Sequence, residues 1–298
     1  MALILPAYAK LNLTLDVIGR RPNGYHDVDS VMQTISLHDL VLVERTDCRV
    51  FEVVGPAIDG ENLVLKAARE LEGHTGRALP FTIRLFKRIP LAAGLGGGSA
   101  DAAAFLRAAN LLYALKLSPG ELAEIATAVG QDVPFLLEGG TARATGLGST
   151  VAPLPPVPAS WRFLVVCPPI QISTRSVFDV VDGGAPSARR TPALIAALQA
   201  PTLTVPRERG REMPKGEGRM GADPVLGNDL EPASRRVFPA LDDAINLLRG
   251  AVPGFTMSGT GAAVFAQFDR RQEAERALNA VRQLGYPAWL CRPIPAAA

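Results

Sequence analysis

Residues 90–100 combine a dense glycine cluster with the start of a helix-forming sequence. Four glycines lie within five positions, namely Gly94, Gly96, Gly97 and Gly98. An Ala- and Leu-rich run without proline follows at 100–115. Glycine lets a ligand approach the backbone closely, and the free N–H groups and dipole of a helix N-terminus attract anions. The pattern therefore favours a phosphate site, with Ser99 as the helix N-cap or as a hydroxyl ligand to a phosphate-bound cation.

This loop departs from the common nucleotide-binding motifs. No Gly-Lys-Ser/Thr ends it, as a P-loop requires, and Ser99 and Asp101 stand where a dinucleotide fingerprint needs Gly or Ala. The sequence also contains no His-Arg-Asp or Asp-Phe-Gly, the signatures of protein kinases. A loop that only needs to be tight would use the same glycines, so the stretch by itself leaves both interpretations open.

Three polar side chains interrupt apolar runs elsewhere in the chain. Lys10 and Asn12 share one face of a half-buried strand expected over 8–17, where apolar residues alternate with polar ones. This shared face makes a polar cluster, although a strand lysine is more often exposed to solvent. Asp132 follows a helix-ending glycine inside an apolar run, where it can serve chemistry or cap a short helix that begins near Pro134.

An aromatic ring and an imidazole follow a turn signal near the N-terminus. The turn is Pro-Asn-Gly at 22–24, and Tyr25 and His26 come directly after it. Side chains of these two types can stack against a flat heterocycle and hydrogen-bond to its edge. The alternative is a turn whose tyrosine packs on the edge of the core.

The remaining pattern predicts alternating strands and helices. Strands are expected at 8–17, 40–45, 49–54, 81–87, 161–167 and 287–292, and a strand and turn at 141–150. Helices are expected to begin at Asn62, at the glycine loop, at Ser118 with a capping box, and after Asp269 as a cap, the last one ending at Gly285. The pattern therefore predicts an α+β layer for the C-terminal half.

Proline and glycine divide the chain. The proline-rich stretch 153–158 is the clearest boundary and predicts two domains, 1–155 and 156–298. The stretch 201–222 contains four glycines, three prolines and mixed charges, so we expect a mobile surface insertion there.

Composition excludes several classes of protein. The 298 residues carry a net charge of +2 without a long basic block, which disfavours nucleic acid as a partner. The three cysteines are far apart and form no Cys-x-x-Cys pair, which disfavours a disulfide framework or a zinc site and suits the cytoplasm. We expect no signal peptide, since the first apolar run stops at Pro6, and no membrane-spanning stretch.

Three motifs in order resemble those of the GHMP kinase superfamily, named for galactokinase, homoserine kinase, mevalonate kinase and phosphomevalonate kinase. They are Pro-Ala-Tyr-Ala-Lys-Leu-Asn-Leu at 6–13, Pro-x-x-x-Gly-Leu-Gly-Gly-Gly-Ser at 90–99 and Met-Ser-Gly-Thr-Gly-Ala at 257–262. Asn-Gly-Tyr-His at 23–26 and Gly-Gln-Asp-Val-Pro-Phe at 130–135 narrow the resemblance to members that act on a cytidyl diphosphate substrate.

The resemblance implies a fold, a reaction and a partner set. The fold is α+β, with an N-terminal domain like domain 2 of ribosomal protein S5, a C-terminal ferredoxin-like domain and an active site in the cleft between them. The reaction is transfer of the ATP γ-phosphate, with Mg²⁺, to the 2-hydroxyl of the cytidyl substrate. The partners are these small molecules, with no nucleic acid or membrane, and the protein is a monomer or homodimer.

The same resemblance implies a role for each matching residue. Asp132 would be the general base and Lys10 its charged neighbour. The ATP phosphates would lie on Pro90, Leu91, Ala92, Ala93, Gly94, Leu95, Gly96, Gly97, Gly98, Ser99 and Ala100. Asn62 and Lys87 would lie near the adenosine, and Ser99 would be a candidate ligand of Mg²⁺. The cytidyl substrate would contact Asn12, Tyr25, His26, Thr174 and Phe178.

Other functions remain open at the level of sequence. A kinase of the same fold could act on another alcohol, such as mevalonate or homoserine. A non-catalytic nucleotide sensor would be expected to lack Lys10 or Asp132, and both are present. An RNA-binding module is disfavoured by the small net charge. Ala100, Gln131, Thr260 and Ala262 depart from the usual family residues but replace no proposed catalytic side chain.

Overall fold

The computed structural model describes residues 1–57, 60–181, 189–200 and 225–296. Its strands are β1 Ala2–Arg20, β2 His26–Arg45, β3 Val50–Val54, β4 Phe81–Phe86, β5 Thr141–Gly146, β6 Thr150–Pro153, β7 Arg162–Val166, β8 Gly227–Asn228, β9 Thr256–Met257, β10 Val264–Phe268 and β11 Ala288–Cys291. Its helices are α1 Leu63–Thr75, α2 Gly97–Leu112, α3 Pro119–Val129, α4 Val133–Glu138, α5 Thr174–Phe178, α6 Arg190–Gln199, α7 Glu231–Val237, α8 Pro239–Ala251 and α9 Arg271–Gln283.

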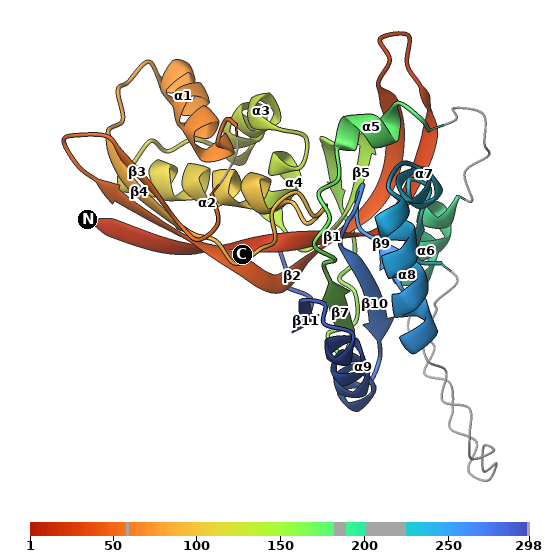
Figure 1. The fold of residues 1–298 in the computed structure, drawn as a ribbon. Helices are drawn as coiled ribbons and strands as arrows, with labels where there is room; N and C mark the ends of the chain where they lie inside the picture. Colours follow the sequence, from red (N-terminus) through yellow and green to blue (C-terminus); the bar gives the residue numbers. More distant parts are fainter. Residues whose placement is uncertain (58–59, 182–188, 201–224, 297–298) are drawn as a thin grey trace.

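Two long antiparallel strands, β1 and β2, form the centre of the N-terminal half. The early part of β2 pairs with β5 and its later part with β4, so one strand joins two parts of the sheet. Helices α1 to α4 lie together over one face of this sheet (Figure 1). They bury an apolar cluster that includes Leu71, Phe81, Phe105 and Phe135. The register between β1 and β2 shifts between Tyr8 and Lys10, as a β-bulge does.

The C-terminal half has the expected ferredoxin-like topology. Strand β7 is followed by helices, the β9–β10 pair, α9 and β11, and the antiparallel sheet has the order β11-β7-β10-β9. Its helices α8 and α9 cover one face of that sheet (Figure 1). The buried residues on this side include Leu164, Leu241, Leu248 and Val281.

A further apolar cluster joins the two halves. It contains Leu11 and Leu13 from β1 together with Phe163 from β7 and Phe265 from β10. The C-terminal sheet covers the apolar face of β1, where Leu11 and Leu13 are completely buried. The polar face is buried as well, since Lys10 is 4% and Asn12 is 5% exposed and both line the cavity between the two halves. The strand expected to be half-buried is therefore enclosed on both faces.

The C-terminal half also returns to the N-terminal sheet. Strand β8 pairs in parallel with β1, and the backbone N–H of Ile294 donates to the carbonyl of Thr34 at 2.9 Å. The expected boundary at 155/156 falls between β6 and β7. The division into two domains stays a prediction, since the chain crosses between the halves more than once.

The expected helix starts at Asn62 and Ser118 are confirmed, since both depend on hydrogen bonds between neighbouring residues. Asn62 is the N-cap of α1, and the Ser118–Glu121 capping box begins α3. Two expectations need correction. The strand expected at 40–45 is the end of β2, which already begins at His26. Arg270, not Asp269, is the N-cap of α9, and Asp269 instead accepts a hydrogen bond from Gln267.

The expected insertion at 201–222 lies outside the described residues. Among the helices that the structure describes, none has the length and apolar character needed to cross a membrane.

Candidate active site

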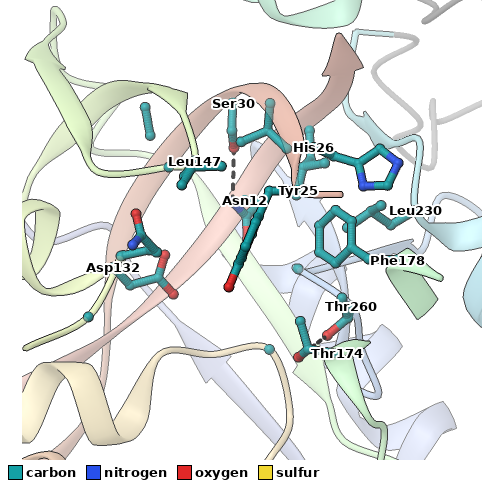
Figure 2. A pocket seen from close by; sticks show the side chains of 18 of the residues that line it. Asn12, Tyr25, His26, Ser30, Asp132, Leu147, Thr174, Phe178, Leu230 and Thr260 are labelled. Carbon is teal, nitrogen blue, oxygen red and sulfur yellow. Dashed lines mark hydrogen bonds between the residues drawn. The ribbon is translucent and has the colours of Figure 1, made fainter. Parts of the chain in front are cut away.

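A cavity of about 1000 Å³ lies between the two halves. The N-terminal half lines it from β1, the turn before β2, the glycine loop and the start of α4, and the C-terminal half from α5 and the 259–260 turn. Such a volume is at the upper end of ordinary ligand sites and leaves room for two substrates. Figure 2 shows side chains from both halves around this space, among them Asn12, Asp132 and Phe178.

Lys10 and Asp132 form the charged centre of this cavity. Lys10 is 4% exposed, and its Nζ lies 3.5 Å from Oδ2 of Asp132. The same ammonium donates to Oδ1 of Asn12 at 2.6 Å, and the Asn12 amide donates to Oγ of Ser30 at 2.9 Å. Each side chain in this chain of contacts is held by the next, so the position of the ammonium is determined by both β1 and β2.

Asp132 also occupies the N-cap position of α4, as one alternative expected. Its side chain, however, makes no capping hydrogen bond to the helix. The Asp132 side chain is 33% exposed and lines the cavity, where it faces Lys10. The Asp132 carboxylate therefore does not stabilise α4 by capping it, and the carboxylate is available to a ligand.

The glycine loop is packed against both halves of the molecule. The backbone N–H of Lys10 donates to the Leu95 carbonyl at 2.9 Å, and the Ser258 hydroxyl donates to the Gly94 carbonyl at 3.0 Å. Gly94 has a φ of +74°, and a Cβ there would overlap the carbonyl oxygen of Ser258. Glycine is thus required at this position by both the backbone conformation and the close approach of the 258–261 turn.

Helix α2 begins at Gly97, directly after the loop. Its N-cap is Gly96, with a φ of +70°, and no side chain caps the helix. Ser99 is therefore not the N-cap that one interpretation assigned to it, because the helix begins two residues earlier. Its hydroxyl group lies in the first turn, and the residue lines the cavity beside Gly94 and Gly96.

Two residues expected near the adenosine have other partners. The Asn62 side chain accepts a hydrogen bond from the N–H of Val64 and so caps α1. Lys87 is buried, with its side chain 1% exposed, and its ammonium donates to the carboxylates of Asp39 and Asp101. Neither Asn62 nor Lys87 lines the cavity. Both side chains thus have partners within the protein, and the expectation that Asn62 and Lys87 lie near the adenosine stays a prediction.

Tyr25, His26 and Phe178 all line the cavity, and Figure 2 shows His26 and Phe178 on the side away from Asp132 with Tyr25 between Phe178 and Asp132. The rings of His26 and Phe178 have centroids 5.4 Å apart and are tilted by 31°. Tyr25 is 63% exposed, whereas His26 is 5% exposed. The turn and the short helix α5, far apart in the sequence, thus contribute to one aromatic surface.

The imidazole of His26 has no hydrogen-bond partner among the described residues. Both ring nitrogens are buried, and neither meets the distance and angle of a hydrogen bond. Burial lowers the pKa of His26 from 6.5, the positive charge of Arg20 lowers it further, and a weak interaction with the Val181 backbone opposes them. A neutral imidazole carries one donor and one acceptor, and neither ring nitrogen is satisfied by the described residues.

Several residues that line the cavity were not among the site residues expected from the sequence. Thr260 meets the expected Thr174, with the two hydroxyl oxygens 3.1 Å apart. Ser30 orients Asn12 from the neighbouring strand, and Leu147 lines the cavity from the turn after β5. Alternation along β2 could have indicated Ser30, but no local signal connects a serine to an asparagine on another strand.

The donor set is compatible with a cation bound mainly through a ligand. The described residues contain no group of three or more His, Cys, Asp or Glu side chains that could hold a metal ion. The Ser99 hydroxyl and the Asp132 carboxylate are oxygen ligands in the cavity, and Mg²⁺ on phosphates needs few protein ligands.

Comparison with known proteins gives consistent matches along the chain. The model for "GHMP kinases N terminal domain" matches residues 62–140, and the one for "GHMP kinases C terminal" matches residues 204–287. A 4-diphosphocytidyl-2-C-methyl-D-erythritol kinase from Moorella thermoacetica is 40% identical over 96% of this chain and 96% of its own length. The kinase of that name from Carboxydothermus hydrogenoformans is 38% identical, over 92% of this chain and 91% of its own.

Solved structures also match over nearly the whole chain. A crystal structure of 4-(cytidine 5'-diphospho)-2C-methyl-D-erythritol kinase superposes with a TM-score of 0.75 at 31% identity, covering 99% of this chain and 100% of that one. Homoserine kinase from Cytophaga hutchinsonii has a TM-score of 0.67 at 18% identity, covering 99% of this chain and 95% of its own, and shares the fold.

Proposed function

This chain belongs to the 4-diphosphocytidyl-2-C-methyl-D-erythritol kinases of the GHMP superfamily, and from that premise we propose its reaction and the residues that perform it. The γ-phosphate of ATP is transferred to the 2-hydroxyl of 4-diphosphocytidyl-2-C-methyl-D-erythritol, giving the 2-phosphate and ADP, in the non-mevalonate route to isoprenoid precursors. The observation that supports this most directly is the Lys10–Asp132 contact of 3.5 Å inside a cavity that also contains the glycine loop and His26.

Asp132 accepts the proton of the reacting hydroxyl. The oxygen of that hydroxyl then bonds to the γ-phosphorus, and the bond from this phosphorus to the bridging oxygen of ADP breaks. Phosphoryl transfer asks a protein mainly for positioning and charge stabilisation. The Lys10 ammonium, held by Asn12, is positioned to offset the negative charge that develops on the transferred group.

The ATP phosphates lie along residues 90–100, against the backbone N–H groups at the start of α2. The free amides and dipole at this N-terminus favour a phosphate. Mg²⁺ neutralises phosphate charge when it is bound. Ser99, whose hydroxyl lies in the cavity lining, is the candidate residue to hold it.

The aromatic end of the cavity binds the cytosine. Tyr25 and Phe178 stack on the two faces of the base. The neutral His26 pairs its donor and acceptor nitrogens with the polar edge of the base, since both nitrogens are without partners among the described residues. Asn12 and Thr174 line the same cavity and contact the remainder of the substrate.

The cell compartment and assembly state belong to the same proposal. The three cysteines are unpaired, and Cys167 and Cys291 are buried. Unpaired thiols suit a reducing compartment, so we expect the enzyme to act in the cytoplasm. The expected monomer or homodimer stays a prediction.

Substrate-dependent ATP consumption tests this function. We expect ADP formation with Mg²⁺ and the cytidyl alcohol, no turnover with homoserine or mevalonate, and inhibition by CMP. Turnover with mevalonate or homoserine alone would assign the enzyme to another alcohol. Tight ATP binding without turnover on any alcohol would indicate a nucleotide sensor.

A further inference from the structure

Three charged side chains are buried together beneath the glycine loop. Lys87, Asp39 and Asp101 have side chains that are at most 1% exposed. The Lys87 ammonium donates to Oδ2 of Asp101 at 2.6 Å and to Oδ2 of Asp39. We call these three residues the buried triad. It joins β2, the residue after β4 and the second turn of α2.

The buried triad connects the two ends of the phosphate loop. Before the loop, Oδ1 of Asp39 accepts the backbone N–H groups of Arg88 and Ile89, the latter at 2.8 Å. After the loop, Asp101 lies on α2 and meets the same ammonium. A Cβ placed on Gly97 would lie 3.6 Å from Lys87 Nζ, so the ammonium is directly under the first residue of the helix.

Stability alone does not explain such an arrangement. Taking charges out of water costs several kcal/mol per ion, and a buried ion pair is often no more stabilising than apolar side chains of similar volume. One oxygen of the triad, Oδ1 of Asp101, has no hydrogen-bond partner in the described part of the chain. The triad instead fixes the geometry between residues 88–89 and α2, because hydrogen bonds are directional and apolar contacts are not.

We propose that Lys87, Asp39 and Asp101 are positioning residues that hold residues 90–96 and the first turn of α2 in the geometry that binds the ATP phosphates. The proposal depends on the proposed function for the identity of the nucleotide. It gives the Lys87 ammonium an action through the backbone, in addition to the expected place of the residue near the adenosine.

The position of the triad separates it from the second substrate. Its residues do not line the cavity, whereas Tyr25 and Phe178 do. A displaced loop moves the amides that meet the phosphates and leaves the aromatic surface where it is. Loss of the triad is therefore expected to act on ATP and to spare the cytidyl alcohol.

The test compares two substitutions at one helical position. Asp101→Ala removes the carboxylate and places the best helix-forming residue in α2, so a loss cannot be attributed to helix propensity. Asp101→Asn keeps an oxygen that can accept from Lys87. Asp242→Ala is the matched control, since Asp242 also lies on a helix, pairs with Arg235 and is outside the cavity. Each full-length variant is titrated with a non-hydrolysable ATP analogue and assayed for both KM values.

We expect Asp101→Ala to raise the Kd of the analogue and the KM of ATP by on the order of tenfold to a hundredfold, as small misplacements of binding groups do. The KM of the cytidyl alcohol should change less than about twofold, which is within ordinary assay variation for residues far from its contacts. Asp101→Asn should recover most of the affinity, and Asp242→Ala should leave both constants unchanged.

Two outcomes would overturn the proposal. One is an unchanged Kd in Asp101→Ala; the other is an equal rise of both KM values, which indicates a general loosening. If Asp101→Ala does not fold, Asp101→Asn takes its place in the test. The KM of ATP must then rise more than the KM of the cytidyl alcohol for the proposal to stand. The binding titration needs no alcohol, so weakened nucleotide binding together with no turnover in the wild type would contradict the proposed function and leave this inference standing.

Discussion

The ammonium of Lys10 lies 3.5 Å from the carboxylate of Asp132, although one comes from the first strand and the other precedes α4. Lys10 is held from the side by Asn12, and Asp132 makes no capping bond to its own helix. Two separate elements thus position the pair, and the Asp132 carboxylate is not engaged in capping its own helix. This is the arrangement expected of a proton acceptor and its charge-stabilising partner.

Asp132→Asn should lower kcat by on the order of 10²–10⁴, because a positioned base is lost. The melting temperature should stay near that of the wild type, since no capping bond is removed. Steady-state kinetics and a thermal melt measure both. Asp179→Asn, also in the cavity lining, is the control and should retain activity. A melting temperature that falls while kcat is kept would make Asp132 a helix cap.

Phe178→Ala should weaken binding of the cytidyl alcohol, because base–aromatic stacking contributes about 1–3 kcal/mol per base. We expect its KM to rise by roughly fivefold to a hundredfold on that scale, with the KM of ATP unchanged. Phe178→Tyr keeps an aromatic ring and should stay near wild type. If the alanine variant affects ATP and not the alcohol, the base at this end of the cavity is adenine.

The protonation of His26 should control the same binding step. Burial and then Arg20 hold its pKa below 6.5, so the imidazole is neutral at pH 7 to 8 and gains a proton only in more acidic solution. Protonation removes the acceptor nitrogen, and the KM of the cytidyl alcohol should rise as the pH falls below 6.5. A His26→Gln variant should lack this rise. A pH profile that is identical in both proteins would exclude His26 from the contact.

Gly94→Ala should abolish tight ATP binding or prevent folding. The residue has a φ of +74°, and a Cβ would overlap the Ser258 carbonyl oxygen. Gly250→Ala is the control, because Gly250 lies in α8 outside the cavity and no atom lies within 4 Å of its added Cβ. Nucleotide titration and circular dichroism compare the two. Equal behaviour of the two variants would mean that the loop moves freely away from the 258–261 turn.

The buried triad should make stability depend on pH. Burial raises the pKa of Asp101 to about 7 against the opposing charge of Lys87, and the charge of Asp39 adds to the rise. The folded protein then binds more protons than the unfolded chain between pH 3.8 and about 7. The free energy of unfolding therefore falls as the pH rises through that window, by at most about 1.4 kcal/mol per pH unit from this group.

Urea unfolding of the wild type and of Asp101→Asn between pH 5 and 8 measures this dependence. The amide does not titrate, so the variant should show a flatter fall over that range. Parallel curves for the two proteins would mean that Asp101 remains ionised throughout.

The sequence by itself determined the features that depend on neighbouring residues. The glycine loop before α2, the Asn62 cap and the Ser118–Glu121 capping box follow from short-range hydrogen bonds and backbone conformation. The three motifs at 6–13, 90–99 and 257–262 also indicated the superfamily, since motif order survives when most other positions have changed.

Only the tertiary structure decided how those pieces are used. Strand β1 has the alternation of a half-buried strand, but its polar face is buried too, because Lys10 and Asn12 line the cavity between the two halves. Lys87 precedes the phosphate loop in the sequence, yet Asp39 and Asp101 enclose its ammonium. Burial and ion pairing depend on which distant segments pack together, and a periodic pattern along one segment carries no information about the partner on its other side.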